Sequence, residues 1–296
     1  MATPIPIPAE VRARLAGLAL SGRGGGGGFG QHPSRSRGAG LEFAEYRAYT
    51  QGDDPRRIDW KLYGRSDRHF VREAERDSTL EVWLLLDATA SMRQADSARP
   101  DYSKLDAAKL LAACVMELAL RQGDRFGVLA LGGAAPLRIP LGTGSRHRDR
   151  CHFALAGLEP AGNWPAADRV VHLAEGIRRE ALVILLSDCF DDGVATLAGQ
   201  LAGAGREVVA VQILVPDERD FPFRGGHRFV DPETGAERRV DAAAVRAGFL
   251  ARFAAAREDL ARRFAAAGIR LATFVTDEAA DAPLRALFGA PRGSGR

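Results

Sequence analysis

Cysteine is scarce in this chain, and the few cysteines have no spacing typical of a disulfide scaffold or a structural zinc site. Three occur among 296 residues, at Cys114, Cys151 and Cys189, and no two of them form a Cys-x-x-Cys pair. A sparse, odd set of distant cysteines is typical of a reducing compartment. We therefore expect reduced thiols and a cytoplasmic location.

Long apolar runs and an excess of one charge sign are also missing. The longest apolar segments, around 80–86 and 110–120, are too short or too interrupted by charge for the roughly 20 residues that a membrane helix needs. The first twenty residues lack the layout of a signal peptide. The 41 basic and 38 acidic residues leave a net charge of +3, which predicts no dedicated nucleic-acid surface. We expect neither a membrane span nor a nucleic-acid partner.

The familiar motifs of catalysis are absent as well. No Gly-x-x-x-x-Gly-Lys loop occurs, and the glycine run 24–28 has no strand before it or helix after it to form a phosphate cradle. The six histidines show no zinc spacing, and no serine sits in a Gly-x-Ser-x-Gly elbow. A phosphoaspartyl mechanism needs a second carboxylate two residues after the nucleophilic aspartate, and Thr89 stands there after Asp87. These absences argue against an enzyme.

What is present is an apolar stretch, 80–86, that ends in an acid and two hydroxyls: Asp87, Thr89 and Ser91. Its composition predicts a strand buried on both faces of a parallel sheet, and sites in such sheets lie at the carboxyl ends of the strands. A second apolar run, 181–187, ends in Asp188. Hard oxygen donors suit Mg²⁺. Alternatively, Thr89 and Ser91 cap the next helix and Asp87 accepts backbone bonds.

The order of the predicted elements indicates an α/β fold with a doubly wound, mostly parallel sheet. We expect a helix packed on a larger body over 8–20, a loop-rich module with a glycine-rich loop over 1–78, and the main domain over 79–296. Segment 125–141 predicts a strand and a hairpin at the sheet edge, and a second hairpin is expected as an insertion near 216–240. Asp241 is expected to start the longest helix.

One long string of residues resembles a known bacterial family, domain of unknown function 58, which carries a von Willebrand factor A-like domain. The residues that carry the resemblance are Glu42-Phe43, Arg47, Tyr49, Gly52-Asp53-Asp54, Arg56, Ile58-Asp59-Trp60, Arg65, Val71-Arg72-Glu73 and the strand end Asp87 to Met92. Thr89 and Gly64 depart from the family pattern, although a threonine keeps the hydroxyl ligand.

The resemblance implies a metal ion-dependent adhesion site built from three loops. Asp87, Thr89 and Ser91 supply the first loop, Thr143 the second and Asp188 the third, with Mg²⁺ or alternatively Mn²⁺ bound. Ser145 is the alternative ligand in the second loop, and an ordinary helix cap there is an equal alternative. The resemblance also implies that the protein acts as an adaptor together with a MoxR-type AAA+ ATPase.

Three functions follow as hypotheses. The first is a non-enzymatic, metal-dependent module that binds a carboxylate of a protein partner, either a MoxR-type AAA+ ATPase or its client. The second is a Mg²⁺-dependent phosphoester hydrolase, in which Asp87 and Asp188 hold the metal and Asp53 or Asp59 acts as base. The third, nucleic-acid binding through the basic segment 146–150, is the weakest. Structural ion pairs and turn bonds are the simpler interpretation of the Gly52-Asp53-Asp54 module.

Overall fold

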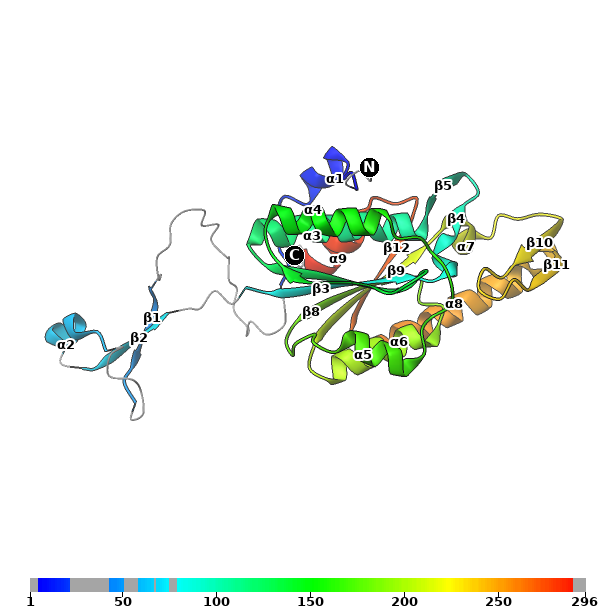
Figure 1. Ribbon diagram of the computed structural model, residues 1–296. Coiled ribbons are helices and arrows are strands. Elements are labelled where there is room, and N and C mark those ends of the chain that lie inside the picture. Colours follow the sequence, from blue (N-terminus) through cyan, green and yellow to red (C-terminus); the bar gives the residue numbers. More distant parts are fainter. Residues whose placement is uncertain (1–4, 22–42, 51–57, 67, 75–78, 290–296) are drawn as a thin grey trace, which may run out of the picture. The chain divides into compact units, whose positions relative to one another are not determined.

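The computed structural model describes residues 5–21, 43–50, 58–66, 68–74 and 79–289 (Figure 1). The chain divides into two compact units, one comprising Met1–Gly26 with Leu80–Arg296 and the other Gly27–Thr79. No helix among the described ranges is both long and apolar enough to cross a membrane. All three cysteines are free thiols.

The larger unit is built on a six-stranded sheet with the order β12-β9-β8-β3-β6-β7. All neighbouring pairs are parallel except β6 and β7, which form an antiparallel hairpin at one edge. The order confirms the predicted doubly wound, mostly parallel α/β fold. The strands are β3 (Glu81–Ala88), β6 (Arg125–Gly132), β7 (Leu137–Gly142), β8 (Leu182–Ser187), β9 (Glu207–Leu214) and β12 (Arg270–Val275).

Helices cover both faces of this sheet, which is why its central strands are apolar on both sides (Figure 1). Along β3, Leu84 and Leu86 pack on one face, while Trp83 and Leu85 pack on the other. The first face is covered by α1 (Ala9–Arg14), α3 (Lys104–Gln122), α4 (Ser145–Ala156) and α9 (Ala282–Phe288). The second is covered by α5 (Ala167–Ala174), α6 (Asp192–Gly203) and α8 (Ala242–Ala266).

Polar caps fix where the main helices begin, and the one at Asp241 is as the sequence predicts. Ser103 and Asp106 form a reciprocal capping box at the start of α3. The side chain of Asp191 accepts the amide of Gly193 at the start of α6, and Asp241 does the same for Ala243 at the start of α8. These caps satisfy amide groups that have no partner within the helix.

The amino-terminal module expected over residues 1–78 included a helix that the structure groups with the larger unit instead. Val11 and Leu15 are buried in the core of the larger unit, and the guanidinium of Arg121 in α3 bonds the Leu15 and Leu18 carbonyl oxygens. The segment therefore belongs to the larger unit, because its apolar stripe completes that core. The helix itself, packed on a larger body, is as predicted.

In its described residues, the smaller unit contains an antiparallel pair and one short helix: β1 (Phe43–Ala48), β2 (Phe70–Ala74) and α2 (Trp60–Ser66). The buried carboxylate of Asp59 accepts the amides of Lys61 and Leu62, so Asp59 caps α2. Asp53 and Asp54 lie outside the described residues.

The remaining elements surround the carboxyl-terminal edge of the sheet. They are the 3-10 turn η2 (Ala90–Arg93), β4 (Ala95–Asp96), β5 (Arg99–Ser103), α7 (Pro216–Asp220), β10 (Gly226–Val230) and β11 (Glu237–Asp241). Strands β10 and β11 pair antiparallel and form the hairpin insertion that the sequence predicts.

Candidate functional site

The two strand ends singled out in the sequence meet at the point where the chain reverses its progress across the sheet. From β3 the chain moves outwards to β6 and β7, then returns to the other side of β3 as β8. Leu86 pairs with Leu186 in parallel register, so Asp87 and Ser187 end adjacent strands and Asp188 follows directly. Such a switch point is where open α/β sheets form their binding crevices.

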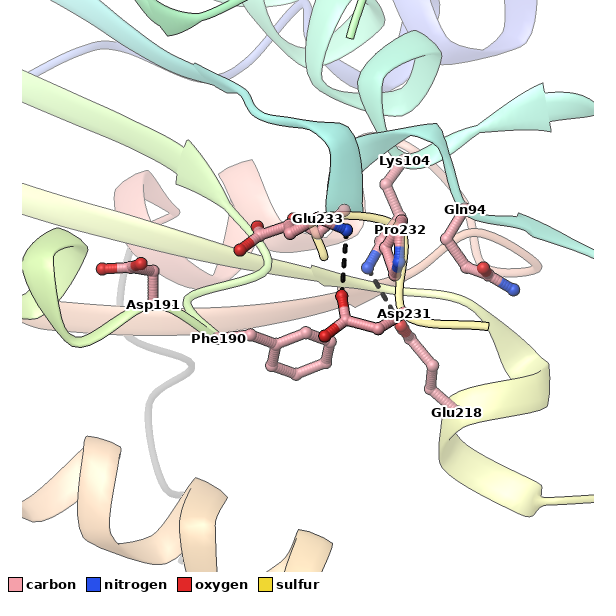
Figure 2. A pocket seen from close by; sticks show the side chains of 9 residues that line it. Gln94, Lys104, Phe190, Asp191, Glu218, Asp231, Pro232 and Glu233 are labelled. Carbon is pink, nitrogen blue, oxygen red and sulfur yellow. Dashed lines mark hydrogen bonds and ion pairs between the residues drawn. The ribbon is translucent and has the colours of Figure 1, made fainter. Parts of the chain in front are cut away.

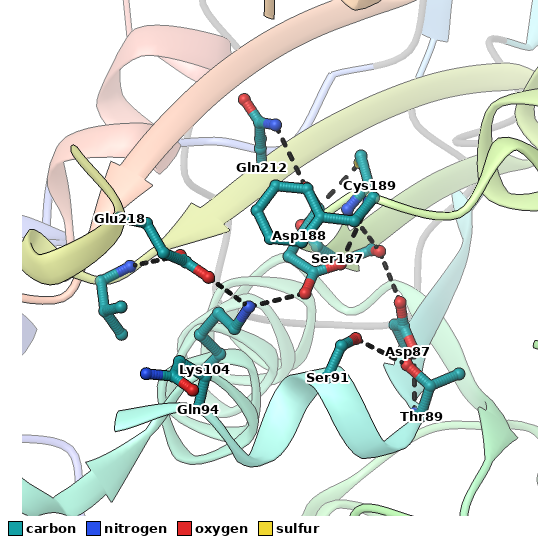
Figure 3. A network of polar contacts seen from close by, with 12 residues as sticks. Asp87, Thr89, Ser91, Gln94, Lys104, Ser187, Asp188, Cys189, Gln212 and Glu218 are labelled. Carbon is teal, nitrogen blue, oxygen red and sulfur yellow. Dashed lines mark hydrogen bonds and ion pairs between the residues drawn. The ribbon is translucent and has the colours of Figure 1, made fainter. Parts of the chain in front are cut away.

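The first loop is held together by hydrogen bonds that converge on Asp87 (Figure 3). Asp87 Oδ1 accepts the Thr89 amide at 2.9 Å and the Thr89 hydroxyl at 2.7 Å. The Thr89 and Ser91 hydroxyl oxygens are 3.0 Å apart. Ser187 donates to the second oxygen, Asp87 Oδ2, at 2.6 Å. The carboxylate thus fixes both the loop and the end of the neighbouring strand.

The charge of Asp87 has little compensation at this position. Its side chain is buried, and the donors to it given above are neutral amide and hydroxyl groups. The net pKa of Asp87 is raised from 3.8 to about 6, because burial and, to a smaller extent, the negative charge of Asp188 outweigh the hydrogen bonds from Ser187 and Thr89, which lower it. A cation beside Asp87 would therefore stabilise its ionised form.

Asp188, in contrast, has a counter-ion of its own. The Lys104 ammonium lies 2.6 Å from Asp188 Oδ2 and 2.9 Å from Glu218 Oε1, and it is almost completely buried (Figure 3). Desolvation lowers the pKa of Lys104, but attraction to Asp188 and Glu218 outweighs it and the net change is upwards. Lys104 is the first residue of α3, where the helix dipole disfavours a cation. The two carboxylates offset that cost.

The structure does not bring Thr143 to this site, which corrects the expected ligand set. Gly142, just before it, pairs with Phe126 at the beginning of β6, and Arg125 pairs there with Glu81 at the beginning of β3. Thr143 therefore lies near the amino-terminal end of β3, whereas Asp87 lies near its carboxyl-terminal end. Ser145, which begins α4, follows at the amino-terminal end and is exposed. The hairpin between β6 and β7 causes this placement. Because β7 runs antiparallel to β6, it returns the chain to the end of the sheet where β3 and β6 begin.

The segment that does reach the strand ends is 157–166, between α4 and α5. The Ala161 amide donates to the Ala88 carbonyl at 2.9 Å, and the Ala90 amide donates to the Gly162 carbonyl at 2.8 Å. Gly132, at φ +89°, ends β6 against the first loop, where an added Cβ would lie 2.6 Å from the Thr89 nitrogen. A close backbone approach at this point thus requires glycine.

The first-loop residues fit a small, hard cation. In octahedral coordination at roughly 2.1 Å, two adjacent oxygen ligands are about 3.0 Å apart, and the Thr89 and Ser91 oxygens have that separation. The Thr89 hydroxyl donates its proton to Asp87, which leaves a lone pair on the Thr89 oxygen for an ion. No group of three or more His, Cys, Asp or Glu side chains within the described part of the chain is placed to hold a metal ion. A metal here would therefore depend on the hydroxyl oxygens.

A cavity of about 260 Å³ opens beside these residues (Figure 2). Ser91 and Lys104 line it from the sheet side, and Phe190, half of which is exposed, forms a wall. The turn of the β10–β11 hairpin completes it with Asp231, Pro232 and Glu233. The lining of this cavity thus carries several acidic groups.

Several of these residues escape sequence reasoning because their roles depend on tertiary structure. Ser187 could have been found, since it directly precedes Asp188 at a strand end. Lys104 gave one weak signal, a basic residue directly after a helix cap. Glu218 and Glu233 gave none, because only the fold brings α7 and the hairpin turn to the strand ends. The structure thus adds four residues to the site: Ser187, Lys104, Glu218 and Glu233.

Comparisons with known proteins were made on sequence and on structure. The family described as "Protein of unknown function DUF58" matches residues 45–259. Uncharacterised proteins of Mycobacterium tuberculosis and Mycobacterium bovis are 31% identical over 252 residues, covering 84% of this chain and 78% of theirs.

Similar solved structures are more distant in sequence. The conserved hypothetical protein BatB from Bacteroides thetaiotaomicron is 17% identical, with a TM-score of 0.41 over 69% of this chain and 94% of that one. An aerotolerance-related membrane protein from Bacteroides fragilis is 17% identical, with a TM-score of 0.43 over 69% and 95%. The SpRpn10 VWA domain is 14% identical, with a TM-score of 0.39 over 74% and 98%.

Proposed function

Since the chain belongs to the DUF58 family, whose description assigns no activity, we propose from its own residues that it is a protein-binding module with a metal-dependent site. Thr89 and Ser91 hold Mg²⁺ through their hydroxyl oxygens, and Asp87 and Asp188 supply the negative charge around it. When bound, the ion offers a coordination position to a carboxylate of a partner. Mn²⁺ shares these ligand preferences.

The observation that carries the proposal is the pair of hydroxyl oxygens, 3.0 Å apart, beside the buried Asp87 carboxylate. The Thr89 hydroxyl donates to this carboxylate, and the Thr89 and Ser91 oxygens lie within hydrogen-bonding distance of each other. A buried carboxylate beside two hydroxyl oxygens is a donor set for a hard cation, which supports a metal-dependent binding site.

The partner is expected to be a protein that presents an acidic side chain. Resemblance to the family favours a MoxR-type AAA+ ATPase or its client, with this chain as an adaptor. The cytoplasmic location expected from the cysteine pattern is part of the same proposal. Purified ATPase should associate with the wild-type chain in Mg²⁺ and dissociate in EDTA.

Unfolding temperature measured with Mg²⁺ and with EDTA tests the metal site directly. An ion that binds only the folded state stabilises it by about 2.7 kcal/mol at a concentration 100 times Kd. Wild-type protein should therefore melt higher in Mg²⁺. Thr89→Val keeps the side-chain shape and removes the hydroxyl, so it should weaken Mg²⁺ binding by roughly tenfold or more.

Thr143→Val is the matched control, because it removes the same hydroxyl at the opposite edge of the sheet. It should respond to Mg²⁺ as the wild type does. A wild-type melting temperature that ignores Mg²⁺, or equal losses in Thr89→Val and Thr143→Val, would contradict the proposed site.

The hydrolase alternative gains no comparable support. Asp59, one of its two candidate bases, accepts the amides of Lys61 and Leu62 and caps a helix. It also belongs to the smaller unit, whereas Asp87 and Asp188 belong to the larger one. A protein-binding role needs no such base.

A further inference from the structure

The turn of the β10–β11 hairpin adds an acidic side chain to the strand-end cavity. Of residues 231–236, which form this turn, Glu233 alone is partly buried, whereas its five neighbours are exposed. Glu233 lines the same cavity as Ser91 (Figure 2). A carboxylate from a separate segment therefore faces the hydroxyl that we assign to the metal.

The turn is built to hold Glu233 in this position. Asp231 Oδ1 accepts the amides of Glu233 at 2.9 Å and Thr234 at 3.3 Å, and Asp231 Oδ2 accepts the Thr234 hydroxyl at 2.7 Å. These bonds use the Asp231 carboxylate for the turn itself. They do not involve the Glu233 side chain, which stays available for the cavity.

Aromatic packing anchors the hairpin to the body of the larger unit. The Phe229 ring of β10 stacks on Phe221, with 5.6 Å between the ring centroids, and Phe221 lies 4.6 Å from Phe249 of α8. Phe249 in turn stacks on Phe253, which contacts Phe190 at the cavity wall. A continuous row of rings thus links the hairpin to the site, which limits how far the turn can move from it.

The electrostatic surroundings of Glu233 agree with this geometry. Burial raises the pKa of Glu233, and the negative charges of Asp191, Asp188 and Asp231 raise it further. A hydrogen bond between the Ser91 and Glu233 side chains acts in the opposite direction. An ionised Glu233 is thus held among other carboxylates, an arrangement that a divalent cation would stabilise.

We propose that Glu233 is an internal carboxylate ligand, which occupies the position on the ion that a partner's carboxylate would take. The inference rests on the proposed metal site and adds to it a ligand from outside the loops that follow β3 and β8. A partner must then displace the hairpin turn before its own carboxylate can reach the ion. The insertion thereby favours partners that can compete with a tethered carboxylate.

Mg²⁺ affinity of the full-length protein, measured by titration calorimetry, tests this assignment. Glu233→Gln replaces a charged ligand oxygen by a neutral one with little change of shape, so it should weaken Mg²⁺ binding about tenfold or more. Glu237→Gln is the matched control on the same hairpin, because Glu237 is exposed and pairs with Arg228 at the surface. It should bind Mg²⁺ as tightly as the wild type.

Hydrogen exchange of the wild-type protein gives a second, independent measurement. If Glu233 binds the ion, Mg²⁺ should slow amide exchange in turn 231–236 as well as in segment 88–93. Slower exchange confined to segment 88–93, or equal Mg²⁺ affinity of Glu233→Gln and wild type, would overturn the role of Glu233 and leave the metal site intact. Absence of any Mg²⁺ binding by the wild type would overturn both proposals.

Discussion

The ionisation of Asp87 affects the stability of the metal-free protein. Burial and the nearby charge of Asp188 raise its pKa from 3.8 to about 6. The folded protein therefore binds a proton more tightly than the unfolded chain does, and ionised Asp87 disfavours folding at pH 7. A shift of this size corresponds to roughly 3 kcal/mol at most.

The sign of the pH dependence follows from this shift. In EDTA, the free energy of unfolding should gain a favourable contribution from Asp87 as pH falls from 7.5 through 6 towards 4, and Asp87→Asn should remove that contribution. Mg²⁺ should reduce it as well, because the ion stabilises the carboxylate at neutral pH. Urea unfolding at several pH values measures the effect. Identical pH profiles for wild type and Asp87→Asn would contradict the raised pKa.

The residues of the first loop could be predicted from sequence because strand, acid and hydroxyls are contiguous. Asp188 could be predicted for a similar reason, since it follows a second apolar strand. The position of Thr143 could not be predicted in this way. Its distance from Asp87 depends on how many strands the chain forms between the two residues and on the direction of each strand. Lys104 pairs with residues 84 and 114 positions away, and no local pattern indicates such pairing.

At the scale of elements, the correctly predicted hairpin of β6 and β7 determines which residues can belong to the site. Strand β7 contains Pro140 and pairs with β6 alone among the described strands, as expected for an edge. An antiparallel return puts residues after β7 at the amino-terminal edge of β3. The predicted hairpin thus already conflicts with Thr143 as a partner of Asp87, and the structure resolves the conflict in favour of the hairpin.

Helix α1 provides an element-scale prediction about domain organisation. Val11 is 4% exposed and packs in the core of the larger unit. Val11→Ala removes two buried carbon atoms and leaves a small cavity, so it should lower the free energy of unfolding of this unit by about 2 kcal/mol. Urea denaturation followed by circular dichroism measures the loss.

The matched control is Val171→Ala in α5, where the valine is 46% exposed. Both substitutions change helix propensity in the same way, so the difference between them reports burial. Equal stability of the two variants would mean that α1 does not contribute to the core. The helical spacing of apolar residues predicted that α1 packs on something, but not on which unit, because periodicity carries no information about the partner.

At the scale of the whole molecule, the proposed metal site lies entirely in the larger unit. Asp87, Thr89, Ser91, Asp188 and Glu233 all belong to Leu80–Arg296, whereas the paired strands β1 and β2 belong to Gly27–Thr79. A ligand stabilises the cooperative unit that binds it. Mg²⁺ should therefore stabilise the two units unequally.

Native-state hydrogen exchange at increasing denaturant concentration can resolve this difference. Peptides from β3 and β8 should become more protected in Mg²⁺, because their exchange requires opening of the unit that holds the ion. Peptides from β1 and β2 should exchange at the same rate with Mg²⁺ and with EDTA, and Thr89→Val should abolish the gain in β3 and β8. Equal protection of both units by Mg²⁺ would instead show that they unfold as one cooperative body.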